Sequence, residues 1–189
     1  MDKIVLDIET KNSFADVGGQ ENLTKLDISF VGVYSYNKNQ YLSFFENELD
    51  KLGPILQNAG LIIGFSSNRF DLPILNKYYN FNVLALESLD ILDEIEEKLG
   101  HRISLDQLAF TNLGANKTGH GLDAIKYYNE KKFEELQKYC LNDVKLTKDL
   151  YEMGLKQGNL MVPTNHGASI VKVPFSWHER LPHDNLTLF

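Results

Sequence analysis

The sequence has little cysteine and no long apolar run, and each shortage excludes a class of protein. Its only cysteine, Cys140, excludes an internal disulfide and a zinc site built from several cysteines. A lone thiol also favours a reducing compartment, so we expect a cytoplasmic protein. The apolar stretch at 60–65 is far shorter than the roughly 20 residues of a membrane span. We therefore expect no membrane association, and the first residues lack the pattern of a secretory signal.

Basic residues are also fewer than acidic ones. The 189 residues include 19 lysines and arginines against 26 acids, which gives a formal net charge of -7. That balance argues against a protein that coats nucleic acid by charge alone. It does not argue against an enzyme whose acids gather in a metal site. The length and the 43% hydrophobic content predict one folded domain with a substantial core rather than a disordered or fibrous chain.

The order of the hydrophobic patterns predicts a mixed α/β sheet. Period-two or β-rich segments indicate a meander of three strands at 3–9, 28–36 and 41–45, with a loop at 10–25. Helical and strand patterns alternate afterwards. We expect helices at 46–59, 73–79, 91–99, 104–113 and 121–157, the last broken near Asn129, and strands at 61–65 and 83–91. Strands first and alternation afterwards are typical of an α/β sheet of mixed direction.

The last 32 residues have a different character. Three prolines and a β-like segment at 170–175 fall within 158–189. We therefore expect residues 1–157 to form the main domain. The remainder, 158–189, is expected to form a short C-terminal β arm or hairpin packed on that domain.

Two acids close the first predicted strand. Because side chains in a strand alternate with a period of two, Asp7 and Glu9 share a face. Acids are poor strand formers, so their place after a run of Ile, Val and Leu is the informative feature. The alternative is that the strand simply ends in solvent here.

Two further acids occupy positions that suggest function. Asp71 lies where a buried strand gives way to a helix, and the alternative is a helix N-cap. Tyr139 and Asp143, at i and i+4, lie on one face of the last helix. Asp143 falls within that helix's apolar stripe, where an aspartate must be paired, hydrogen-bonded or metal-bound. The alternative is a salt bridge to Lys3 or Lys138. The stripe comprises Phe133, Leu136, Cys140, Val144, Thr147 and Tyr151.

Taken in order, these motifs resemble the DEDD exonucleases in their tyrosine branch (DEDDy). The matching segments are Asp7-x-Glu9, residues 64–73 with Asp71, and Tyr139-x-x-x-Asp143. They are also similar to family-B polymerase proofreading domains and to YprB-type ribonuclease H-like domains. The resemblance spans about 3–152 and includes the segments at 90–92 and 104–109. It implies a ribonuclease H-like fold with a mixed sheet of five or more strands flanked by helices. Relatives often carry an asparagine where this chain has Ser66.

The resemblance also implies a metal site. Two carboxylates about 4 Å apart repel by roughly 4 kcal/mol at an effective dielectric of 20, so four together need protons or cations. Oxygen ligands favour Mg²⁺ or Mn²⁺. Two such divalent cations would be held by Asp7, Glu9, Asp71 and Asp143. Tyr139 would orient the attacking water.

The implied reaction is stepwise hydrolysis of DNA or RNA from a 3′ end, preferentially single-stranded, with release of 5′ nucleotides. The expected substrate-binding residues are Thr10, Phe65, Asn68, Arg69 and Phe70, with Phe14 as a further stacking candidate. The seven lysines of 117–148 suggest that the strand enters beside the last helix, unless they are a solvated face. A polymerase or helicase partner would be a separate protein.

Two other functions are compatible with the same motifs. One is a non-catalytic module of this fold that binds nucleic acid or protein, which the low basic content favours. The other is a structure-specific endonuclease. The oligomeric state and the choice between DNA and RNA are not encoded in these patterns.

Overall fold

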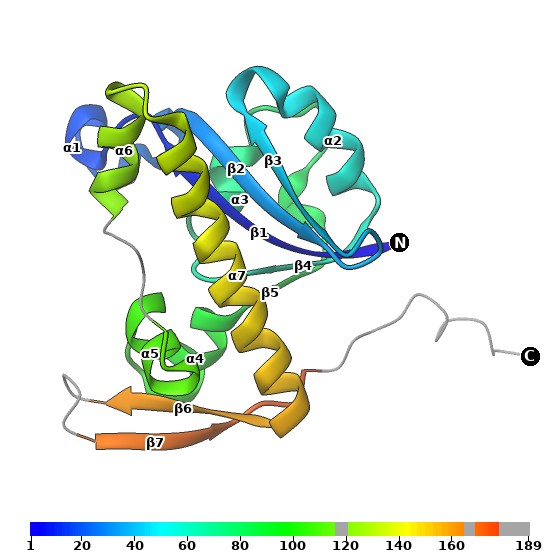
Figure 1. Cartoon of the computed structure of the whole chain (residues 1–189), viewed down its shortest axis with the longest axis vertical. Helices are drawn as coiled ribbons and strands as arrows, with labels where there is room; N and C mark the ends of the chain where they lie inside the picture. Colours follow the sequence, from blue (N-terminus) through cyan, green and yellow to red (C-terminus); the bar gives the residue numbers. More distant parts are fainter. Residues whose placement is uncertain (116–120, 165–168, 178–189) are drawn as a thin grey trace, which may run out of the picture.

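A mixed five-stranded sheet forms the centre of the computed structural model, which describes residues 1–115, 121–164 and 169–177. Its strand order is β3-β2-β1-β4-β5 (Figure 1). The central strand β1 pairs antiparallel with β2 and parallel with β4, which confirms the expected mixed direction. The strands are β1 (Asp2–Thr10), β2 (Ile28–Ser35), β3 (Gln40–Phe45), β4 (Ala59–Gly64) and β5 (Ser88–Asp90).

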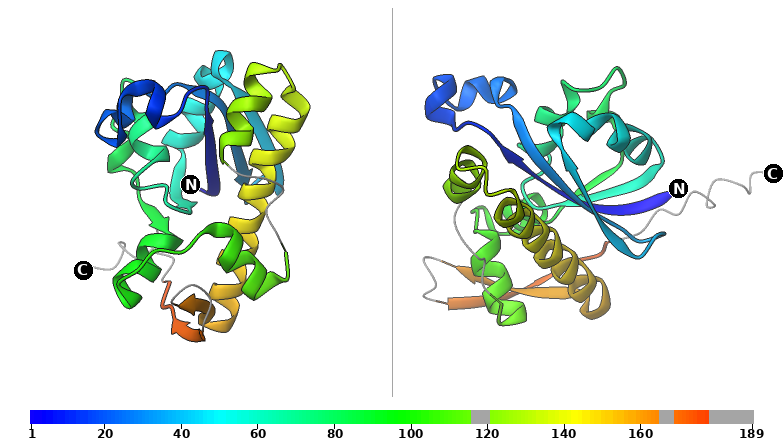
Figure 2. Two further views of the ribbon diagram at one scale, coloured as in Figure 1. Left: turned by 90° about the vertical axis from the view of Figure 1, so that its left-hand side faces the viewer. Right: turned by 45° about the horizontal axis from the view of Figure 1, so that its top comes forward.

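Helices cover both faces of this sheet (Figure 2). One face packs on α2 (Leu49–Gln57) and α3 (Asp71–Asn76). The other packs on α4 (Ile91–Leu99), α5 (Leu105–Leu113) and α7 (Phe133–Gln157), and α6 (Gly121–Asn129) precedes α7. Short helical turns are α1 (Phe14–Val17), η1 (Gln20–Lys25), η2 (Glu46–Glu48) and η3 (Val83–Ala85). Within the described ranges, no helix combines the length and the apolar composition that crossing a membrane would require.

A glycine in β2 lets α7 approach the centre of the sheet. Gly32 lies opposite Asp7 in the β1–β2 ladder. A Cβ at Gly32 would lie 3.0 Å from both Cys140 Sγ and Val144 Cγ2. Since that is tighter than an ordinary carbon contact, any larger residue would push α7 outward. The close approach holds this part of α7 against β1.

Three expectations about local structure are wrong. The predicted strand 83–91 is a strand only at 88–90, because Asn82 accepts a hydrogen bond from the Leu84 N–H and caps the turn η3. The predicted loop 10–25 contains α1 and η1. Phe133 is 43% exposed instead of continuing the buried stripe of α7. The expected break near Asn129 is confirmed, with Lys131 in a left-handed conformation (φ 57°) between α6 and α7.

The C-terminal segment forms the expected hairpin from β6 (Asn159–Thr164) and β7 (Ser169–Pro174). Its residues Val162 and Val173 join the core formed by α4, α5 and α7. Trp177 stacks on Tyr151 of α7, with ring centres 5.4 Å apart. A Cβ at Gly154 would lie 2.3 Å from the Trp177 ring, so α7 needs a glycine there. Residues 165–168 and 178–189 of the predicted arm lie outside the described residues.

Candidate functional site

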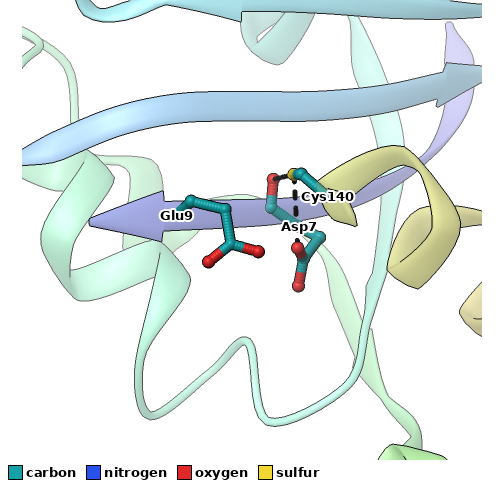
Figure 3. Close-up of side chains that lie close together, drawn as sticks. All are labelled: Asp7, Glu9 and Cys140. Atoms are coloured by element: carbon teal, nitrogen blue, oxygen red, sulfur yellow. Dashed lines mark hydrogen bonds between the residues drawn. The ribbon is translucent and has the colours of Figure 1, made fainter. Parts of the chain in front are cut away.

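The carboxylates of Asp7 and Glu9 lie on the same side of β1, near its C-terminal end (Figure 3). One ligand atom of each, together with Cys140 Sγ, lies within 4.8 Å of the others. Glu9 is only 8% exposed, so the strand does not end in open solvent. The period-two argument is therefore confirmed for the placement of this pair.

Cys140 contributes a hydrogen bond to this cluster. Its thiol donates to Asp7 Oδ2 at 3.3 Å and lies 3.5 Å from the Asp7 carbonyl oxygen (Figure 3). Burial raises the pKa of the Cys140 thiol well above its usual range, and the charges of Asp7 and Glu9 raise it further. A neutral thiol is a poor metal ligand, because metals bind the thiolate. The ligand atoms offered here are thus the carboxylate oxygens.

Asp71, the first residue of α3 after the loop that follows β4, bonds to β1 beside these two acids. Its Oδ1 accepts a hydrogen bond from the Ile8 N–H at 2.9 Å, which anchors it between Asp7 and Glu9 in β1. The side chain is 4% exposed. The N-cap interpretation is wrong, because the cap position of α3 is Phe70 and the Asp71 carboxylate bonds to β1 instead.

The last helix supplies the remaining two candidates. Tyr139 and Asp143 are each 3% exposed on the buried side of α7. The charge of Asp143 contributes to the raised pKa of both Asp71 and Cys140, which places it in the same electrostatic neighbourhood. Lys3 and Lys138 were the alternative salt-bridge partners of Asp143. The Lys3 ammonium lies 4.2 Å from the centre of the Tyr36 ring, and Lys138 is exposed.

The donor set suits a hard divalent cation. Burial raises the pKa of Asp71 to about 7, the hydrogen bond from Ile8 opposes that rise, and the charges of Asp90 and Asp143 add to it. Burial is the largest cause of this rise, so the ionised Asp71 carboxylate lacks the stabilisation that water would give it. A bound cation would supply that stabilisation, and carboxylate oxygens are the ligands that Mg²⁺ and Mn²⁺ prefer. Asp7 and Glu9 form the acidic centre of that candidate site.

A pH dependence of stability follows from Asp71. Its folded-state pKa of about 7 exceeds the ordinary 3.8, so the folded protein holds this proton more tightly than the unfolded chain does. The resulting stability is complete below about pH 4 and is lost as the pH rises through about 7. We expect the metal-free protein to lose thermal stability between about pH 5 and about pH 8, and Mg²⁺ to restore more of it at the higher pH.

Melting temperatures with a chelator and with Mg²⁺ across that range measure the effect. Asp71→Asn is the matched variant, because its amide oxygen can still accept the hydrogen bond from Ile8. A metal-free pH slope that Asp71→Asn leaves unchanged would contradict the assignment to Asp71.

Asp90 is a site residue that the sequence reasoning did not include among its candidates. Its carboxylate is 2% exposed and accepts hydrogen bonds from four backbone N–H groups. Two come from Ser66 and Asn68 in the loop before Asp71, and two from the first turn of α4. The sequence signal was an aspartate directly before a helical pattern, which predicts an N-cap. The tertiary structure shows in addition that Asp90 binds the loop that leads to Asp71.

Asp90→Asn is expected to weaken cation binding by about 10-fold, the usual cost of losing support behind a ligand. An asparagine can accept bonds on one side only, so its amide would face an N–H group of the loop or of α4. Stability is also expected to fall by about 2 kcal/mol. Mn²⁺ titration and urea unfolding measure the two effects. Glu87→Gln, an exposed change three residues earlier, is the control, and equal Mn²⁺ affinity in both variants would refute the prediction.

Several predicted substrate-binding residues line a pocket beside this site. Its volume is about 350 Å³, and Glu9, Thr10 and Phe70 contribute to its wall. Phe14 and Phe70 meet there edge to face with ring centres 5.9 Å apart. The other lining residues are Ile8, Asn12, Ser13, Leu26, Leu122 and Ile125. The pocket is therefore lined by the Glu9 side of the candidate site and by aromatic and polar residues.

The other predicted substrate-binding residues, Phe65, Asn68 and Arg69, lie in the loop after β4. Each already contacts other residues of the protein. Phe65 packs against the core of α4, α5 and α7. Asn68 accepts a hydrogen bond from Ser88 and donates one to Asp93. Arg69 forms ion pairs with Asp93 and Glu96 at 3.1 and 2.8 Å. A substrate contact by Arg69 would have to compete with these ion pairs.

Ser66, at the position where relatives often carry asparagine, has a left-handed backbone (φ 66°). Asparagine is among the residues that adopt this conformation most readily. The hydroxyl of Ser66 instead accepts a hydrogen bond from Arg102 at 2.8 Å. In this chain the loop after β4 is therefore linked to Arg102 through the Ser66 hydroxyl.

Comparison with solved structures places this architecture among known folds. The family B DNA polymerase from the hyperthermophilic archaeon Pyrobaculum calidifontis matches with a TM-score of 0.61 and 18% sequence identity. The match covers 82% of this chain but only 24% of the polymerase chain. At this identity it shows a shared fold alone. Among curated proteins, none matches the sequence.

A protein-family model described as the RNase_H superfamily matches residues 4–154, which include all four site carboxylates. The expected ribonuclease H-like fold is thereby confirmed. Proteins of this superfamily are mostly phosphodiester hydrolases, and its nucleases typically use divalent metals. Since the match extends over most of its length, the chain belongs to the RNase H superfamily.

Proposed function

We propose that this protein is a metal-dependent 3′-5′ exonuclease of the DEDDy type, acting on single-stranded ends of DNA or RNA. The observation that carries the proposal is the pair of carboxylates on Asp7 and Glu9, of which Glu9 also lines a pocket of about 350 Å³. That volume lies within the range of small-ligand pockets and suits a terminal nucleotide. The position of Tyr139 one turn before Asp143 supports the tyrosine branch.

The site residues would divide into cation ligands, groups that position those ligands, and groups that contact the substrate. Asp7, Glu9, Asp71 and Asp143 would hold two divalent cations, Mg²⁺ or Mn²⁺. When bound, such cations activate water and neutralise the charge that develops on a phosphodiester during in-line displacement. The hydrogen bond from Ile8 keeps Asp71 at β1, and the Cys140 thiol orients Asp7. Phe14 and Phe70 would flank the terminal base and thereby position the end of the strand.

Tyr139 would orient the attacking water through its hydroxyl. A tyrosine pKa near 10 makes positioning a better role for it than proton abstraction. Tyr139→Phe is expected to lower kcat by about 10- to 100-fold while KM and the melting temperature change little, in line with the loss of one positioned polar group. Steady-state kinetics on a labelled oligonucleotide measures this. A larger change in KM than in kcat would argue against the assigned role.

The direct test compares a single strand that has a free 3′ end with one that has no end. A 5′-labelled single strand with a free 3′ end should give a ladder of products one nucleotide apart in Mg²⁺ or Mn²⁺. A covalently closed single-stranded circle of the same sequence should remain intact, because a strict exonuclease cannot begin on it. Cleavage of the circle would indicate an endonuclease instead. An intact linear substrate together with no cation-dependent stabilisation would favour a non-catalytic binding module.

A further inference from the structure

A second pocket lies away from the carboxylates, between η2 and the junction of α6 and α7. Its volume is about 360 Å³. It is lined by Ser29, Phe45, Glu46, Asn47, Tyr128 and Phe133. None of these residues lines the pocket at Glu9, so the two are separate. Neither the family resemblance nor the proposed reaction assigns it a role.

Aromatic rings form the walls of this second pocket. Phe133 meets Phe45 edge to face at 5.6 Å between ring centres and meets Tyr128 at 6.2 Å. Edge-to-face pairs leave ring faces available to a third planar group. Phe133 is 43% exposed, whereas the next stripe residues of α7, Leu136 and Cys140, are fully buried. An exposed phenylalanine beside two other rings suits a flat ligand that can stack.

Polar groups lie among these rings. Glu46 and Asn47 offer acceptors and a donor, and the buried Ser29 hydroxyl forms no hydrogen bond within the described residues. Lys11 pairs with Glu46 and holds its ammonium 5.6 Å from the centre of the Tyr128 ring. Aromatic walls, hydrogen-bonding groups and a lysine in contact with two of the lining residues are together features that bind a nucleotide: its base, its base edge and its phosphate.

Lys11 also connects the two pockets. It directly follows Thr10 and precedes Asn12, both of which line the pocket at Glu9. In the β1–β2 ladder Glu9 pairs with Phe30 and Thr10 pairs with Ile28, so Ser29 of the second pocket lies beside these two residues of the first. A strand whose last nucleotide lies at Glu9 would therefore need only a short further length to reach the second pocket.

We propose that the second pocket binds the base of a nucleotide upstream of the scissile bond, with Phe133 and Tyr128 as its stacking surface. This inference rests on the proposed function, because it assumes that a single strand enters at Glu9. Its consequence is that affinity rises with substrate length once the strand reaches Phe133. Short substrates would bind through the pocket at Glu9 alone.

The test measures binding of 5′-fluorescent single strands of about two to eight nucleotides to the whole chain carrying Asp7→Asn, which prevents cleavage. Adding Phe133→Ala is expected to weaken binding of the longer strands by about 10-fold, within the range for one stacked base, and to affect the dinucleotide much less. Phe133→Trp should restore the length dependence, because it keeps an aromatic face. Phe110→Ala is the matched control, since Phe110 is 59% exposed on α5 and lines neither pocket.

The outcomes separate the two proposals. If Phe133→Ala and Phe110→Ala bind all lengths equally, the second pocket is not a nucleotide site, whatever the enzyme cleaves. If binding depends on Phe133 but the unmodified protein releases no nucleotides, the exonuclease proposal fails and the binding site stands. If strands of every length fail to bind, both are refuted.

Discussion

Replacing Asp7 by asparagine is expected to lower nucleotide release by at least about 10³-fold while the protein remains folded, because a charge that holds the catalytic cations is lost. The side chain keeps its size, and its remaining oxygen can still accept the hydrogen bond from Cys140. Cation-dependent stabilisation should fall with activity, since both depend on the same ligand. Single-turnover assays and melting curves with and without Mn²⁺ measure the two effects.

Asp50→Asn provides the matched control for this experiment. It removes one carboxylate charge from an exposed position in α2, so activity and Mn²⁺ response should remain at the level of the unmodified protein. If Asp7→Asn degrades oligonucleotides at the unmodified rate, Asp7 does not belong to the catalytic site. If it is inactive but gains as much stability from Mn²⁺ as before, the cations bind elsewhere.

Gly64→Ala is expected to destabilise the fold by about 1–3 kcal/mol, the usual cost of adding a methyl group to a tightly packed position. Gly64 is the last residue of β4, and a Cβ there would lie 2.2 Å from Ser67 Oγ and 2.3 Å from Ser67 Cβ. The loop 65–70 would have to move, and that loop carries Asp71 to its hydrogen bond with Ile8. Mn²⁺ affinity should therefore fall together with stability, as urea unfolding and Mn²⁺ titration would show.

A second substitution can separate this steric cause from a general loss of packing. Ser67→Gly removes both atoms that the new methyl group would meet, and the Ser67 hydroxyl makes no hydrogen bond to any described residue. By itself it should cost about 0.5–1 kcal/mol, because glycine gains freedom in the unfolded chain. The double variant should recover much of the stability and Mn²⁺ affinity that Gly64→Ala loses. Strictly additive effects would show that the predicted clash is not the cause.

Predictions from the sequence were correct where the periodicity of a single strand or helix determines the position of a side chain. The period-two rule placed Asp7 and Glu9 on one face of β1, since backbone sterics alone set that alternation. The helical period placed Tyr139 and Asp143 together on the buried face of α7. The same rule misplaced Phe133, because the first turn of α7 extends beyond the core that buries the following turns.

Long-range contacts account for what sequence reasoning missed. Asp71 had a helix N-cap as its alternative interpretation, and Asp90 was not among the candidate site residues. Asp90 does cap α4, yet it also binds the loop that carries Asp71. Asp71 bonds to Ile8, 63 residues away along the chain. No local pattern encodes such partners, because they depend on which strands become neighbours.

By itself the sequence determined the succession of strands and helices and the face on which most acidic candidates lie, since backbone geometry and hydrophobic periodicity act over a few residues. Only the tertiary structure decided that β1, the loop after β4 and α7 converge, that one pocket forms at the end of β1, and that a second forms between η2 and the junction of α6 and α7. Burial in that arrangement raises the pKa of Asp71, and the charges of Asp90 and Asp143 from other segments add to the rise. Both effects depend on what surrounds the group in space and not on separation along the chain.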